Sequence, residues 1–134
     1  MLREKEDRIR EVLGEGRRPP DTVDCEVLER FEYAYPGRPT ELKIETDEFT
    51  SVCPMTGLPD FATLEITYVP DRYCVELKSL KYYLIQYRNV GIFYEHVVNK
   101  ILDDLVAVCA PSRMEVKGMF KVRGGMSVVA RASV

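Results

Sequence analysis

The stretch VCPMTGLPDF, residues 52–61, carries two reactive side chains at the two ends of a stiff loop. Two prolines fix φ and one glycine permits positive φ, so the segment is predicted to fold back as a loop rather than a strand or helix. Cys53 and Asp60 lie seven residues apart in it. A thiol and a carboxyl on one rigid loop supply a nucleophile and a proton donor for covalent catalysis. The alternative is a thiol that only packs and an aspartate that only forms a turn.

The segments around this loop predict an antiparallel sheet with two helices. Apolar and polar residues alternate on both sides of the loop, which is typical of half-exposed strands. Later, apolar residues recur every three or four positions in two segments, as in amphipathic helices, and two more alternating segments follow. The expected strands cover residues 41–46, 62–68, 114–122 and 126–132, and the expected helices cover residues 80–87 and 93–108. The predicted fold class is α+β, with the order ββααββ and a helix pair on one face of a four-stranded sheet.

Residues 1–40 are predicted to form an N-terminal helix and extended arm, ahead of a catalytic domain over residues 41–134. The charged stretch 2–13 has a modest apolar stripe, which indicates a short helix that ends at Gly14. Four prolines in residues 14–40 favour an arm wrapped on the surface. The expected anchor of this arm is the aromatic cluster Phe31, Tyr33 and Tyr35.

Size, composition and charge are those of one globular domain without a membrane or nucleic-acid partner. The chain has 134 residues, of which 46% are apolar and 31% charged, and its net charge is −3. It has no basic tract, no apolar run close to a membrane span and no secretion signal, so the cytoplasm is the expected location. Four cysteines without a C-x-x-C pair and one histidine argue against a structural zinc site and against disulfides.

Three motifs follow one another along the catalytic domain. They are FTSVCPMTGLPDF at 49–61, ELKSLKYY at 76–83 and YRNVGIFYE at 87–95. Together they resemble the QueF family, the nitrile reductases of queuosine biosynthesis, in its short single-domain form. The second motif matches the family signature E-(S/L)-K-(S/A)-x-K-(L/Y)-(Y/F/W) at every position. The resemblance implies a tunnelling fold and NADPH-dependent reduction of 7-cyano-7-deazaguanine (preQ0) to 7-aminomethyl-7-deazaguanine (preQ1).

The resemblance also implies roles for individual residues. Cys53 is expected to add to the nitrile carbon and form a covalent thioimide, since a thiolate is the best soft nucleophile that a protein offers. Asp60, protonated beforehand, is expected to deliver a proton to the nitrile nitrogen. Glu95 is expected to grip the N–H edge of the base, where two carboxylate oxygens meet two adjacent donors. The other expected substrate contacts are Phe93, Tyr94, Glu76 and Ser79.

The second motif is expected to bind NADPH. Lys78 and Lys81 lie one turn apart near the start of the first predicted helix, where free N–H groups already attract anions. Ser79, Arg88 and Arg123 are the other expected cofactor contacts, although Ser79 is equally suited to cap the helix. The sequence has no glycine-rich dinucleotide fingerprint, so this NADPH site is not of the Rossmann type. No metal is expected in the chemistry.

The expected assembly is a homo-oligomer, a decamer of two pentameric rings with active sites between subunits. The family resemblance implies rings, and the predicted sheet has two open edges of a length that proteins normally cover or pair. No direct nucleic-acid contact is expected. One departure from the family pattern lies beside Glu95: Tyr94 stands where a histidine is frequent, and the lone His96 follows the glutamate.

Two other functions stay open at this stage. A related amidinotransferase adds ammonia to the nitrile of preQ0 already held in tRNA, in archaeosine synthesis. It would use Cys53 and Asp60 but no dinucleotide, and the intact lysine signature and acidic net charge argue against it. The second is a non-catalytic tunnelling-fold protein that binds a purine or pterin, which has no reason to keep a thiol and an acid on one loop. A metal-dependent cyclohydrolase of that fold is disfavoured by the shortage of histidine.

Overall fold

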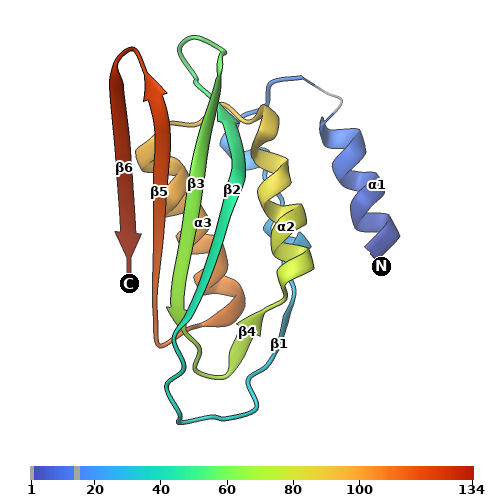
Figure 1. Cartoon of the computed structure of the whole chain (residues 1–134). Helices are drawn as coiled ribbons and strands as arrows, with labels where there is room; N and C mark the ends of the chain where they lie inside the picture. The colour runs from blue at the N-terminus through green and yellow to red at the C-terminus, as the bar shows by residue number, and fades with distance from the viewer. Residues whose placement is uncertain (1, 14–15) are drawn as a thin grey trace.

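A four-stranded antiparallel sheet is the centre of the computed structural model, which describes residues 2–13 and 16–134 (Figure 1). Its strands are β2 (Leu42–Val52), β3 (Pro59–Val69), β5 (Arg113–Arg123) and β6 (Met126–Ser133), paired in that order. Between β3 and β5 the chain forms α2 (Leu77–Ile85), the short 3-10 helix η3 (Gln86–Asn89) and α3 (Tyr94–Cys109). The predicted α+β class and ββααββ order are confirmed.

One face of the sheet is buried and the other is partly open. On β3, Leu64, Ile66 and Tyr68 are buried, while the residues between them are half-buried. Met114 and Val116 of β5 lie on the same buried face. The apolar sides of α2 and α3 belong to this core, and α3 runs behind the sheet in Figure 1. Each large apolar side chain buried there contributes about 1.5–3 kcal/mol.

A bulge in β2 reverses which of its residues face the helices. Thr46 and Phe49 pair with residues of β3 that are only two positions apart, so β2 carries one extra residue. Before the bulge, Leu42 and Ile44 pack against the core; after it, Phe49 and Ser51 are buried instead. An extra residue shifts the alternation by one position and turns the other side chains inward. The strand predicted at 41–46 is therefore only the first half of β2.

The N-terminal part begins with α1 (Leu2–Leu13), as predicted, whereas the expected stop at Gly14 lies outside the described residues. The elements after it are η1 (Pro20–Thr22), η2 (Cys25–Val27) and β1 (Arg30–Glu32). β1 pairs with β4 (Tyr73–Val75) in a small antiparallel sheet, which the sequence did not predict. None of the helices within residues 2–13 and 16–134 is long and apolar enough to span a membrane.

The aromatic anchor predicted for the arm is wrong for Phe31 and Tyr35, whereas Tyr33 is half-buried. Phe31 and Tyr35 are 55% and 58% exposed. The arm is held instead by Val23, Val27 and Leu28, which are buried in the same core as the helices. The physical reason is that β1, which carries Phe31, pairs with β4 in a separate two-stranded sheet and all three of its residues are exposed, whereas η2 packs on α2.

Candidate active site

The predicted reactive loop is shorter than the stretch 52–61, because the two flanking strands extend into it. Val52 pairs with Pro59, so only residues 53–58 lie outside strands. The turn is closed by two backbone hydrogen bonds, from Cys53 N to Leu58 O and from Gly57 N to Cys53 O, both 2.9 Å long. Gly57 adopts a φ of 73°, which other residues rarely adopt. Asp60 therefore lies on a strand and Cys53 at the end of one, which holds both side chains more rigidly than a loop would.

Asp60 lies on the buried face of β3 and is only 5% exposed. Its Oδ1 accepts a hydrogen bond from the hydroxyl of Tyr94 at 2.9 Å and another from Nη1 of Arg123 at 2.6 Å. Ser51, directly across from Asp60 on β2, is buried on the same face because of the bulge. Because of the bulge, the end of β2 that leads into Cys53 turns its buried side chain to the same face of the sheet as Asp60.

The environment of Cys53 lowers the pKa of its thiol to about 7. The largest cause is a hydrogen bond with the side chain of Thr56, followed by hydrogen bonds with the backbone of Thr56 and Met55. Partial burial opposes the shift, and a hydrogen bond with Arg123 adds to it. A thiol with this pKa is partly ionised at neutral pH, which suits a nucleophile.

A backbone bridge brings the start of α3 to the reactive loop. Val52 donates from its N–H to Val90 O at 2.9 Å, and Ile92 donates from its N–H to Val52 O at 3.0 Å. Phe93 then serves as the N-cap residue of α3, and Glu95 lies exposed in its first turn. This parallel bridge joins segments almost forty residues apart and explains why the third sequence motif meets the first.

These elements enclose a cavity of about 400 Å³ at the end of the sheet where the β2–β3 loop and the β5–β6 turn lie (Figure 1). Its walls are Cys53, Pro54, Asp60, Ile92, Phe93, Tyr94, Glu95, Arg123, Gly124, Met126 and Val128. Six of the residues predicted for the site are among them: Cys53, Asp60, Phe93, Tyr94, Glu95 and Arg123. The cavity combines a reactive thiol, a buried acid and apolar walls, which suits a flat heterocycle with one electrophilic group.

The other predicted site residues lie on α2 and η3, outside this cavity. α2 begins at the opposite end of the sheet (Figure 1). There the carboxylate of Glu76 accepts hydrogen bonds from the backbone N–H groups of Lys78 at 2.8 Å and Ser79 at 2.7 Å, so Glu76 is the N-cap. Hydrogen bonding to Lys78 N–H lowers the pKa of Glu76. Ser79 is buried, donates to Glu76 O and accepts from Glu29 N–H, so it is not the cap residue.

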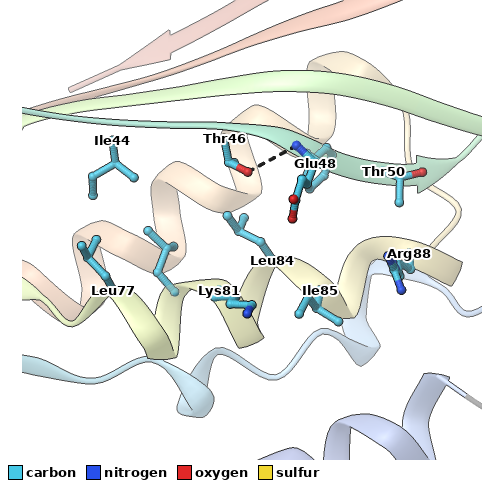
Figure 2. A pocket seen from close by; sticks show the side chains of 11 residues that line it. Ile44, Thr46, Glu48, Thr50, Leu77, Lys81, Leu84, Ile85 and Arg88 are labelled. Carbon is cyan, nitrogen blue, oxygen red and sulfur yellow. Dashed lines mark hydrogen bonds between the residues drawn. The ribbon is translucent and has the colours of Figure 1, made fainter.

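Lys81 and Arg88 line a second hollow, a groove of about 450 Å³ between α2 and β2 (Figure 2). Leu77, Leu84 and Ile85 form its apolar side on α2, as Figure 2 shows. Glu48, at the β2 bulge, lines the facing wall. Lys78 is exposed near the start of α2 and does not line the groove. The predicted cofactor residues are thus split, with Arg123 in the first cavity and the cations of α2 and η3 elsewhere.

Two residues near the reactive groups were missed by the sequence reasoning. Thr56 is the largest cause of the lowered pKa of the Cys53 thiol and also accepts a hydrogen bond from Nη2 of Arg123. Its position, three residues after the cysteine in a tight turn, is a signal that could have found it. Ser51 carries a buried hydroxyl without a hydrogen-bond partner among the described residues. Only the β-bulge turns Ser51 inward, so no local pattern predicts it. Within residues 2–13 and 16–134, no cluster of His, Cys, Asp or Glu could hold a metal ion.

Known proteins resemble this chain over most of its length. The family described as "QueF-like protein" matches residues 59–134. The NADPH-dependent 7-cyano-7-deazaguanine reductase of Chlorobium luteolum is 55% identical over 108 residues, which cover 81% of this chain and 93% of the relative. The enzyme of the same name from Caldicellulosiruptor bescii is 58% identical over 113 residues, which cover 83% and 86%.

A solved structure has the same fold at much lower sequence identity. The archaeosine synthase QueF-Like in the apo form superposes with a TM-score of 0.67 and 22% identity. The match covers 72% of this chain and 94% of that one. At this identity the likeness concerns the fold alone. The family match, with relatives more than half identical over four-fifths of the chain, assigns the sequence: this chain belongs to the QueF-like protein family.

Proposed function

We propose that this chain is an NADPH-dependent 7-cyano-7-deazaguanine reductase, which converts the nitrile of preQ0 to the aminomethyl group of preQ1 in queuosine biosynthesis. The relatives that carry this name support the activity. The observation that carries the proposal is the pairing of a thiol with a pKa lowered to about 7 and a buried carboxyl in the wall of one cavity. A nitrile carbon needs a soft nucleophile, and the nitrogen needs a proton as charge develops on it.

The first chemical step adds the Cys53 thiol across the C≡N bond. A bond forms between Sγ and the nitrile carbon, and one π pair of the triple bond moves to the nitrogen. The thiol proton passes to Asp60 as Cys53 ionises, and Asp60 delivers it to the nitrogen. The product is a thioimide in which all atoms and charges balance. The position of Asp60 on β3, in the wall of the same cavity as Cys53, supports this role.

The base is held by the rim and walls of the same cavity. Glu95 offers two carboxylate oxygens to the adjacent N–H donors of the deazaguanine edge, a bidentate contact that rejects rings without those donors. Ile92 and Phe93 on one side, with Met126 and Val128 on the other, offer apolar surfaces to the ring faces. In this proposal Cys53 holds the reacting carbon of the substrate. Glu95, from a separate motif, holds the far edge of its ring.

The groove between α2 and β2 fits a phosphate-bearing nicotinamide cofactor. The cationic side chains of Lys81 and Arg88 line it beside an apolar side. The carboxylate of Glu48 could accept a hydrogen bond from a ribose hydroxyl. Lys78 adds a third cation near the α2 N-terminus. NADPH, when bound, supplies the reducing equivalents, two molecules for the four electrons that separate a nitrile from an amine. Cys53 leaves the carbon during this reduction and returns to its starting state.

We further propose that the chain adopts the tunnelling-fold assembly, a decamer of two pentameric rings. β2 and β6 have no strand neighbour on their outer edges in the described residues, and β6 exposes Met126, Val128 and Val129. Open edges and exposed apolar side chains favour association. In such a ring, Glu76 and Ser79 of one subunit would act at the cavity of another. Size-exclusion chromatography with light scattering tests the assembly: a monomer at micromolar concentration would contradict it.

NADPH oxidation, followed with 7-cyano-7-deazaguanine added and omitted, tests the activity directly. Without NADPH, intact-mass analysis should find one substrate mass added to the protein, and Cys53→Ala should abolish it. Cys25→Ala, which removes an exposed thiol of the arm, is the matched control and should keep the adduct. A parent protein that forms the adduct but never oxidises NADPH, and instead consumes ammonia with nitrile-bearing tRNA, would be the amidinotransferase.

A further inference from the structure

Asp60 receives both of its side-chain hydrogen bonds on one oxygen. The Tyr94 hydroxyl lies 2.9 Å from Oδ1, and Nη1 of Arg123 lies 2.6 Å from the same atom. Among the described residues, no group donates a hydrogen bond to Oδ2. A carboxyl oxygen that already accepts two donors is poorly suited to carry the acidic proton, because the proton would face both donors. The geometry therefore distinguishes the two oxygens of Asp60.

The Tyr94 hydroxyl is held in place by the packing of its ring. The ring stacks on Phe120 of β5, with centroids 4.0 Å apart and planes 21° apart. Phe120 in turn lies against Gly118, where a Cβ would come within 2.8 Å of the Phe120 ring. Stacked rings of this kind have few alternative rotamers, so the hydroxyl has a defined position. Burial, with Asp60 as the next cause, raises the pKa of Tyr94, so the hydroxyl keeps its proton and stays a donor at neutral pH.

We propose that Tyr94 is a positioning residue for Asp60: its hydroxyl holds Oδ1, so that the proton for the nitrile nitrogen leaves from Oδ2. This inference rests on the proposed nitrile reduction. Arg123 shares the oxygen, but it is the last residue of β5 and its guanidinium also donates to Thr56, so it divides its hydrogen bonds between two acceptors. The tyrosine comes from the start of α3 and approaches from a different element. Two donors on separate elements define the plane of the carboxyl, which one donor would leave free to turn.

Tyr94→Phe is the direct test, because it removes only the hydroxyl and keeps the stacked ring. The kcat for nitrile reduction should fall about 10- to 100-fold, the usual effect of losing one hydrogen bond to a charged group. The KM for the nitrile base should stay unchanged, because Tyr94→Phe keeps the ring that lines the cavity, and the variant should remain fully folded at the assay temperature. Tyr33→Phe is the matched control. It removes a hydroxyl bonded to Arg38 O and Thr40 on the far side of the fold, and its kcat should equal that of the parent.

A double-mutant cycle with Asp60→Asn separates positioning from every other role. If Tyr94 works through the Asp60 carboxyl, Tyr94→Phe should cost nothing further in the Asp60→Asn background, measured as the rate of Cys53 adduct formation. Additive losses, a raised KM with normal kcat, or a fall in melting temperature that accounts for the lost rate would each overturn the proposal. A normal kcat in Tyr94→Phe would overturn it while nitrile reduction stands. A parent protein without nitrile-dependent NADPH oxidation would overturn the proposed function and this inference together.

Discussion

Arg123, the last residue of β5, joins the end of that strand to the start of β3 through an ion pair with Asp60, in which Nη1 lies 2.6 Å from Oδ1. The same guanidinium donates from Nη2 to the hydroxyl of Thr56 in the reactive loop. It also helps to lower the pKa of the Cys53 thiol. Asp60 raises the pKa of Arg123, so this side chain keeps its charge. One cation thus links the proposed acid, on β3, and the proposed nucleophile, in the loop between β2 and β3.

Thr56→Val should raise the pKa of the Cys53 thiol from about 7 towards its ordinary value of 9.0, because it removes the largest cause of the lowering. A lowered thiol pKa means that thiolate is present above about pH 7 and is lost as the pH falls through that value. The midpoint of the rate of alkylation by iodoacetamide should therefore move to higher pH. Peptide mass spectrometry distinguishes alkylation of Cys53 from alkylation of the exposed Cys25. Thr56→Ser keeps the hydroxyl and should keep the midpoint; an unmoved midpoint in Thr56→Val would contradict the assignment.

Glu95→Leu should weaken binding of the nitrile base and leave NADPH binding alone. In this variant the two N–H donors on the edge of the base have no acceptor. Each unpaired donor weakens binding by about 1–3 kcal/mol if the edge is buried. Isothermal titration calorimetry of the Cys53→Ala background, which avoids adduct formation, measures this affinity. Glu95→Gln keeps the shape but loses one acceptor, so its affinity should fall between the two. If the Cys53→Ala protein and its Glu95→Leu and Glu95→Gln variants bind the base equally well, Glu95 is only a carboxylate at the start of a helix and does not contact the base.

Lys78→Ala combined with Lys81→Ala should raise the KM for NADPH and spare the Cys53 adduct. The two ammonium groups are proposed to neutralise cofactor phosphates, whereas nitrile addition needs neither. The effect should shrink in high salt, because attraction between exposed charges is screened. Lys43→Ala combined with Lys117→Ala changes net charge equally on the open face of the sheet, where both lysines pair with Glu65. If this control raises the KM as much, the cause is net charge and not a phosphate site.

Ser51→Ala should leave the free energy of unfolding unchanged or raise it by up to about 1 kcal/mol. The buried hydroxyl of Ser51 has no hydrogen-bond partner among the described residues, so its removal relieves a desolvation cost. Ser79→Ala is the matched comparison, because its hydroxyl donates to Glu76 O and accepts from Glu29 N–H. That variant should lose about 1–2 kcal/mol. Urea unfolding compares the two, and a larger loss in Ser51→Ala would mean that its hydroxyl has a partner in the folded assembly.

The local patterns of the sequence determined the elements and the chemistry of the reactive loop. Alternation of apolar and polar residues is a short-range property, so β3, β5 and β6 were predicted close to their observed bounds. The spacing of apolar residues likewise placed α2 and α3. Prolines and a glycine around Cys53 indicated the turn, because they act through their own φ angles.

What only the tertiary structure decided was which side chains meet. The bulge after Thr46 depends on pairing between two whole strands, and it turns Ser51 and the end of β2 to the side of Asp60. The contacts of Tyr94 and Arg123 with Asp60 join residues 34 and 63 positions apart, and no local pattern encodes them. For the same reason no local pattern shows that Glu76, predicted as a substrate contact, caps α2 at the end of the sheet opposite the cavity within one chain. The periodicity of apolar residues is a property of neighbouring residues. Strand register and side-chain packing arise only when segments that are distant in the sequence pack around one core.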